Sequence, residues 1–140
     1  MDVIRRNTDY AIRAAVSLAV NQGYGAVSAA EIAKKEAIPY DLACKLLQKL
    51  HRKKIVKSVM GAKGGFLLNK KASNISILEV IEAIQGPVSL NRCVLDARFC
   101  IRKKSCPVSR NLAKLQKTMN SYLKSVKLSK LTGSGKKYYD

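Results

Sequence analysis

The feature that most constrains how this chain folds is a very short connection, Ala37-Ile38-Pro39, between two segments with helical periodicity. Ser28 and Glu31 have the spacing of a capping box and predict a helix that ends at this connection. The proline of the connection suits the first turn of a second helix, which we expect over residues 40–53. Two helices joined by so tight a turn predict a helix-turn-helix.

The second of these helices carries apolar and polar side chains on opposite faces. Its buried stripe is expected to be Leu42, Leu46, Leu47 and Leu50. In the groove of a duplex, Lys45 can donate to guanine, Gln48 can pair with adenine and Asp41 can accept from cytosine; each is alternatively an ordinary exposed polar residue. The residues of this helix expected to contact DNA are Tyr40, Asp41, Cys44, Lys45, Gln48 and Lys49.

A glycine-rich hairpin is predicted directly after the helix-turn-helix. Residues 55–59 are rich in β-branched side chains, and the apolar run 66–68 follows the sequence Gly-Ala-Lys-Gly-Gly. A hairpin in this place is a wing, from which Lys63 can reach the DNA backbone or minor groove. A phosphate-binding loop is excluded, because no Gly-Lys-Ser/Thr motif occurs here and the segment opens no helix.

The net charge points to a polyanionic partner. Twenty-seven Lys and Arg stand against nine Asp and Glu, a formal net charge of +18. Two Phe and no Trp provide no aromatic run for stacking bases, which favours duplex DNA over RNA. No apolar run approaches the ~20 residues of a membrane helix, and the N-terminal apolar stretch has no signal-peptide cleavage site. We therefore expect a cytoplasmic protein without a membrane partner.

Three of the four cysteines lie close together in a loop of about twenty residues that follows Gly86-Pro87. Disulfides are rare in the cytosol, so Cys93, Cys100 and Cys106 are free thiols, metal ligands or redox groups. Thiolates on one loop can converge on a metal, and iron–sulfur clusters prefer thiolate ligands. The alternative is three incidental thiols in a basic loop. The single His and nine acidic residues form no nucleophile–base set, so we expect no enzyme.

The long helix predicted near the C-terminus has an apolar seam with alternating steps of three and four residues, as in a coiled coil. The seam consists of Leu112, Leu115, Met119, Tyr122 and Val126.

These motifs together resemble one family, the Rrf-type winged-helix regulators, which includes IscR-type and NsrR-type proteins. The resemblance rests on Thr8-Asp-Tyr-Ala11, Ala30-Glu-Ile-Ala33, the wing from Ser58 to Leu68, and the trio Cys93, Cys100 and Cys106. It implies a homodimeric transcription factor with its interface on the C-terminal helix. It also implies that the cysteine loop holds an iron–sulfur cluster, two-iron or four-iron, whose state controls DNA affinity.

The chain departs from the family pattern at several positions. Met60 stands where the family wing usually has Arg, and Lys63 can substitute for that Arg. Met60 and Lys63 are the wing residues expected at DNA. Ser109 stands where IscR-type members have a His ligand. Other members use an N-terminal acidic ligand, and Asp9 matches that position, although it could equally be a helix-start residue.

The expected fold is mainly α with a small β wing: a winged helix-turn-helix plus a long C-terminal dimerisation helix. The expected domains are the DNA-binding domain 1–72, the segment 73–132 with the cysteine loop and dimerisation helix, and the flexible tail 133–140. The expected function is a DNA-binding transcriptional regulator, a repressor, controlled by the cluster. The rivals are a cluster-free regulator that responds to a metabolite, a partner protein or thiol oxidation, and an RNA-binding protein.

Overall fold

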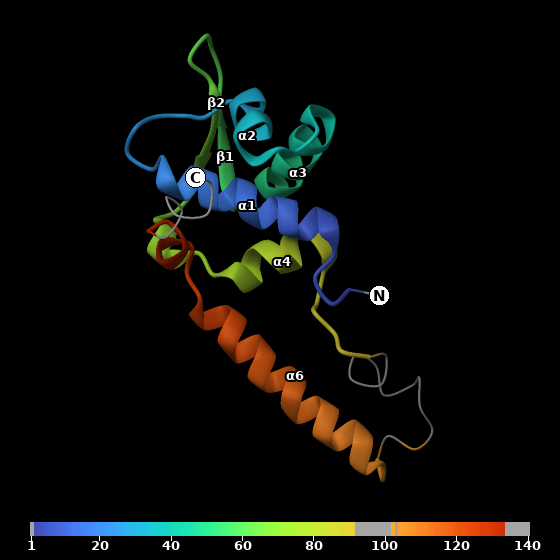
Figure 1. Cartoon of the computed structure of the whole chain (residues 1–140). Helices are drawn as coiled ribbons and strands as arrows, with labels where there is room; N and C mark the ends of the chain where they lie inside the picture. Colours follow the sequence, from blue (N-terminus) through green and yellow to red (C-terminus); the bar gives the residue numbers. More distant parts are fainter. Residues whose placement is uncertain (1, 92–101, 103, 134–140) are drawn as a thin grey trace.

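The computed structural model describes residues 2–91, 102 and 104–133. It is mainly helical, with one two-stranded antiparallel sheet, as the sequence predicts (Figure 1). None of the helices in this part of the chain is both long and apolar enough to span a membrane. The elements are α1 (Arg6–Val20), α2 (Ala29–Glu36), α3 (Tyr40–Arg52), β1 (Val56–Val59), β2 (Gly65–Leu68), η1 (Ala72–Asn74), α4 (Ile77–Gln85), α6 (Pro107–Ser125) and η3 (Leu128–Leu131).

The helix-turn-helix forms as predicted, and its turn is set by backbone geometry. The Ser28 hydroxyl accepts a hydrogen bond from the Glu31 N–H at 3.2 Å and caps α2. At the end of α2, Ala37 adopts a left-handed conformation with φ of 53°. This residue reverses the chain so that Ile38 is buried and α3 can begin immediately afterwards.

One detail of the helices differs from the sequence prediction. In α3, Leu42 is only half-buried and Ala43 takes its place in the interior, at 1% exposure. The small side chain of Ala43 packs with Ala33 and Ile38, on the side of α3 that faces α2.

The wing is anchored at its root. Strands β1 and β2 pair from Val56 opposite Leu68 to Val59 opposite Gly65. Val27 adds a bridge to Phe66, with both backbone hydrogen bonds formed at 3.0 and 2.8 Å. A side chain at Gly65 would overlap with the Val27 carbonyl, so a glycine is required where these segments meet.

The C-terminal part of the chain returns to the core of the winged helix. Leu128 is fully buried, and its N–H donates to the Ile75 carbonyl at 2.9 Å. The Ile77 N–H donates to the Val126 carbonyl at the same distance. These contacts fix the C-terminal end of α6, while its body extends away from α2, α3 and the wing (Figure 1). The division into the expected domains 1–72, 73–132 and 133–140 remains a prediction from the sequence.

Candidate nucleic-acid interface and cysteine segment

The predicted contact residues of α3 share an accessible surface. Asp41, Lys45, Gln48 and Lys49 are exposed, Tyr40 is 57% exposed, and Cys44 is half-buried. The opposite side of α3 is held in the core by Leu46, Leu47 and Leu50. This face is therefore free to enter a groove while the helix stays fixed.

Tyr40 and Cys44 lie one helical turn apart and interact. A hydrogen bond to Cys44, followed by the negative charge that Cys44 carries when ionised, raises the pKa of Tyr40 above its usual value. The phenol is protonated at neutral pH with or without this shift. An exposed tyrosine hydroxyl at the start of α3 can donate to a phosphate oxygen.

The other predicted DNA contacts lie at the tip of the wing. Met60 is 93% exposed and Lys63 is exposed. The tip is a tight turn in which the Gly64 N–H donates to the Gly61 carbonyl at 3.0 Å. The wing projects at the end of the molecule where α2 and α3 lie (Figure 1). Helix α3 and the wing tip therefore present polar and basic side chains at the same end.

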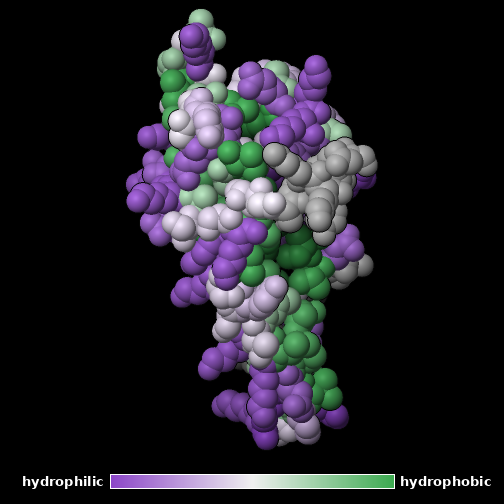
Figure 2. Space-filling view, turned by 60° about the vertical axis from the view of Figure 1, so that its left-hand side comes forward, coloured by the Kyte–Doolittle hydropathy of each residue, from purple (hydrophilic) through white to green (hydrophobic). Residues whose placement is uncertain are grey.

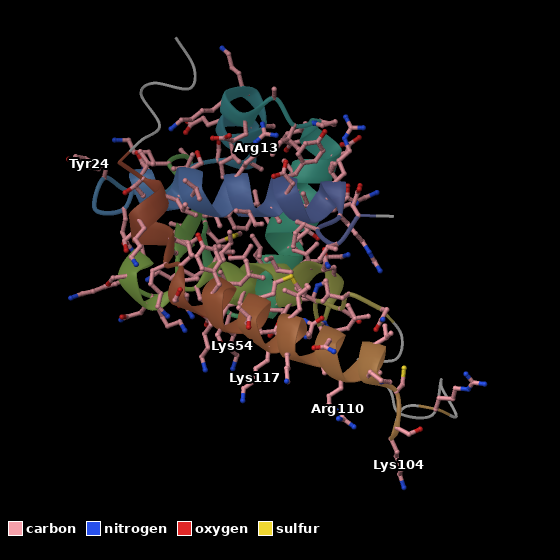
Figure 3. All side chains as sticks on the ribbon, turned by 60° about the horizontal axis from the view of Figure 1, so that its bottom comes forward. Arg13, Tyr24, Lys54, Lys104, Arg110 and Lys117 are labelled. Atoms are coloured by element: carbon pink, nitrogen blue, oxygen red, sulfur yellow. The ribbon has the colours of Figure 1, made fainter. Side chains whose placement is uncertain are left out.

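Arg13 forms a group of contacts with Asp9, Tyr10 and Glu36 that the sequence did not predict, and this group joins α1 to the end of α2. Arg13 lies between α1 and α2 (Figure 3), and its guanidinium is 3.5 Å from a Glu36 carboxylate oxygen and 3.9 Å from that of Asp9. It also donates to the Glu36 backbone carbonyl and lies over the Tyr10 ring, 5.4 Å from its centroid. The spacing of Asp9 and Arg13 was a visible signal, but nothing local pointed to Glu36.

The structure places one of the three candidate cysteine ligands. Cys106 is half-buried and free, and it stands immediately before α6. Cys93 and Cys100 lie outside the described residues. Asp9 is in the first turn of α1, and its side chain is 60% exposed. Within the described ranges, no three His, Cys, Asp or Glu residues form a group that could hold a metal.

Helix α6 buries polar residues and exposes apolar ones. Gln116 is 6% exposed: its amide donates to the Val88 carbonyl at 2.7 Å and accepts from the Leu90 N–H at 2.9 Å. In contrast, Leu115 is 52% and Tyr122 67% exposed. In Figure 2, apolar side chains follow one side of the lower part of the molecule. Leu115 and Tyr122 of the predicted seam are therefore uncovered in the single chain, whereas Leu112, Met119 and Val126 are half-buried. Gln116 joins α6 to the segment after α4.

Solved structures share this architecture. CymR of B. subtilis, described as its global cysteine regulator, has a TM-score of 0.80 and 24% identity, covering 94% of this chain and 97% of that chain. IscR of T. potens has a TM-score of 0.72 and 22% identity, covering 98% and 91%. At these identities the similarity shows a common winged-helix fold with a long C-terminal helix.

Sequence comparisons define the family. The Rrf2 family model, described as iron-dependent transcriptional regulator, matches residues 4–134. The HTH-type transcriptional regulator ORF2 of Azotobacter vinelandii is 31% identical over 122 residues, which cover 87% of this chain and 74% of that protein. The HTH-type regulator IscR of Escherichia coli is 37% identical over 84 residues, 60% of this chain and only 52% of that protein. The chain therefore belongs to the Rrf2 family of transcriptional regulators.

Proposed function

We propose that this protein is a homodimeric, cluster-controlled repressor that reads duplex DNA with α3 and the wing. The observation that carries the proposal is the common placement of the exposed α3 face and the exposed wing tip at one end of a fixed core. A rod-like duplex fits such a surface, with α3 in the ~12 Å major groove and the wing at the adjacent backbone or minor groove.

The residues of this surface divide by chemistry into base-reading and phosphate-holding groups. Asp41, Lys45 and Gln48 are exposed donors or acceptors suited to base edges. Tyr40 and Lys49 flank them and suit phosphates, as does Lys63 on the wing. Cys44 and Met60 supply small or apolar contacts. The phosphate contacts set position and salt sensitivity, whereas the base contacts set the preferred sequence.

The signal-sensing part of the proposal is an iron–sulfur cluster, two-iron or four-iron, on Cys93, Cys100 and Cys106, with Asp9 as the fourth ligand. The surroundings of Cys106 suit a thiolate ligand: the thiol precedes the positive end of the α6 dipole, and Arg102 and Lys104 are close in sequence. The exposed Asp9 carboxylate is accessible. When bound, such a cluster supplies a centre sensitive to redox state, nitric oxide or cluster supply.

Dimerisation is proposed through the uncovered seam of α6. Pairing two seams removes the exposed apolar surface of Leu115 and Tyr122 from water. A twofold dimer then presents two copies of α3 to a near-palindromic operator.

Anaerobic purification, followed by absorption spectroscopy and analysis of iron and sulfide, tests the cluster. The expected result is bound iron and sulfide that are lost in Cys106→Ala, together with altered affinity for a DNA operator selected from a random-sequence pool. Cys44→Ala, a matched removal of a thiol outside the trio, is expected to keep the iron. Loss of the iron–sulfur absorbance without any change in operator binding would remove the switch and leave the DNA-binding function.

A second candidate is a cluster-free regulator that responds to thiol oxidation. It is favoured by Cys44, a free and half-buried thiol on the proposed DNA-contacting face. Purified protein without iron and sulfide, whose operator binding is weakened by an oxidant in the wild type but not in Cys44→Ser, would support it. Preference for structured RNA over duplex DNA at matched salt would contradict both candidates.

A further inference from the structure

Helix α6 carries a line of exposed basic side chains, which we name the α6 ridge. In Figure 3, Arg110 and Lys117 point outward from the same side of α6, and Lys104 extends in the same direction just before the helix. The α6 ridge consists of Arg110, Lys114, Lys117 and Lys124, all of them exposed.

Among the described residues, no ion pair compensates the positive charge of the α6 ridge. No acidic residue occurs in the sequence between Ala97 and Tyr139, so α6 cannot form ion pairs along its own length. Within the described part of the chain, the ion pairs are Arg13 with Asp9 and Glu36, and Lys70 with Glu79. None of these reaches α6. Arg110, Lys114 and Lys117 lie on consecutive turns, and Lys124 lies two turns further on. These like charges repel one another, and a polyanion relieves that repulsion.

The α6 ridge and the apolar seam use different sides of the helix. At about 100° per residue, Lys114 and Lys117 lie on the side opposite Leu115 and Met119. Gln116, which packs on the segment after α4, lies between these two sides. Figure 2 shows the same division, with hydrophilic side chains on one side of the lower part of the molecule and apolar ones on the other. Covering the seam with a second chain therefore leaves the ridge exposed.

The α6 ridge is also remote from the proposed operator-binding surface. Helix α3 and the wing lie at one end of the molecule, and α6 extends from the other (Figure 1). A straight duplex held by α3 and the wing therefore does not pass along the ridge. The ridge needs a ligand of its own.

We propose that the α6 ridge binds the phosphate backbone of a second DNA segment, so that a dimer on its operator can join two segments. The ridge spans about 21 Å, a length over which one DNA strand presents about six phosphates. A surface of a single sign suits this uniformly charged partner better than an acidic protein, whose interfaces mix polar, apolar and charged groups. This inference rests on operator binding by α3 and the wing.

A bridging assay tests the proposal with the full-length protein. Beads carry a duplex with the operator selected from a random-sequence pool, and the probe is a fluorescent duplex of unrelated sequence. We expect wild-type protein on the beads to capture the probe. In Lys114→Gln/Lys117→Gln, the slope of log affinity for the probe against log salt concentration should become shallower by about 2. The amount of captured probe should fall by at least about fivefold. Glutamine retains helix propensity, so operator affinity is expected to stay within about twofold.

The matched control is Lys71→Gln/Lys130→Gln, which removes the same charge from exposed positions outside α3, the wing and the ridge. This control should capture the probe as the wild type does. Equal loss in the control would show a net-charge effect and overturn the proposal, as would full capture by the ridge variant. Displacement of the probe by polyglutamate more readily than by unlabelled duplex would overturn it in favour of an acidic protein partner. Loss of operator binding by the wild type would instead contradict the proposed function.

Discussion

At the scale of single residues, Arg13 connects α1 to the start of the helix-turn-helix turn. Its guanidinium is shared by the Glu36 carboxylate and backbone carbonyl and by Asp9. The Glu36 side chain is only 10% exposed, so a carboxylate left without a partner there would be costly. A contact between residues 23 apart in sequence therefore joins α1 to the end of α2, just before the turn of the helix-turn-helix.

Arg13→Ala is expected to destabilise the protein by about 1–3 kcal/mol, because the buried Glu36 carboxylate loses its partner. Urea denaturation measures this loss. Arg6→Ala is the control: Arg6 is exposed, donates a hydrogen bond to the Tyr10 hydroxyl at 2.8 Å and lies 5.6 Å from the centroid of the Tyr10 ring, but it has no ion pair among the described residues. Its loss should cost less than about 0.5 kcal/mol. Equal effects of the two substitutions would contradict the role assigned to Arg13.

Met60 is the residue at which the wing departs from the family pattern. It is 93% exposed at the tip, and in the proposed complex a cation there would meet phosphates or a narrow minor groove. Met60→Arg should tighten operator binding and steepen the slope of log affinity against log salt concentration by about 0.9. Met60→Gln should leave this slope unchanged. Fluorescence anisotropy over a series of salt concentrations measures both. An unchanged slope in Met60→Arg would mean that the tip does not approach the DNA.

At the scale of elements, α4 has the most complete cap. The Ser76 hydroxyl accepts from the Glu79 N–H at 3.1 Å, and the Glu79 carboxylate accepts from the Ser76 N–H at 2.7 Å. Burial raises the pKa of Glu79, but the Ser76 backbone N–H and the Lys70 ammonium outweigh it, so the pKa lies below its usual 4.5. The ionised form therefore stabilises the folded state above the unfolded pKa, and this contribution is lost as the pH falls through the folded pKa.

Glu79→Gln tests this pH dependence. The wild type should exceed the variant in free energy of unfolding at about pH 6, and the difference should shrink by about pH 3 as Glu79 becomes protonated. Urea denaturation at both pH values gives the two differences. Glu82→Gln, an exposed neighbour on the same helix, is the control and should show a smaller change. If the difference in free energy of unfolding between wild type and Glu79→Gln did not vary with pH, the ionised Glu79 carboxylate would not be what stabilises the cap.

Helix α3 is expected to combine two kinds of DNA contact. Gln48→Ala should cost about 1–3 kcal/mol in operator binding and relax the base preference at one position. Lys49→Ala should weaken binding to all sequences evenly and lower the salt slope by about 1. Competition with single-base operator variants separates the two effects. If Gln48→Ala weakened binding to all operator variants equally, the Gln48 side chain would contact the DNA phosphate backbone rather than a base.

At the scale of the whole molecule, the sequence predicted the elements well because their ends carry local signals. Ser28 and Pro39 act through neighbouring backbone groups, and these effects are visible in a short window of sequence. The arrangement of partners was harder to predict. Ala43 is buried and Leu42 only half-buried, because Ala43 packs against Ala33 and Ile38. Gln116 is buried against Val88, which lies 28 residues away in sequence. Such contacts follow from tertiary packing, which local periodicity does not encode.

The candidate site was predicted in the same uneven way. The exposed face of α3 and the wing tip follow from periodicity and turn residues, whereas the Arg13–Glu36 contact depends on how α1 packs against α2. The positions of Cys93 and Cys100 lie outside the described residues, and their role stays a prediction.

The apolar seam of α6 predicts the oligomeric state. Leu115→Glu should weaken the dimer by at least tenfold, because it places a charge in the paired surface at a cost above about 1.4 kcal/mol. Sedimentation velocity at several concentrations measures this. Lys114→Glu introduces the same residue at the neighbouring ridge position and should leave the dimer intact. Monomeric wild-type protein would contradict the seam as the interface.

Sequence-specific DNA binding by α3 and the wing is tested by selection of duplexes from a random-sequence pool with the full-length protein, followed by sequencing. We expect the wild type to enrich a near-palindromic sequence whose half-sites are separated by about one helical turn or a small multiple of it. Lys45→Ala/Gln48→Ala should fail to enrich that sequence. Failure of the wild type to enrich any duplex, even at low ionic strength, would rule out DNA recognition by this surface.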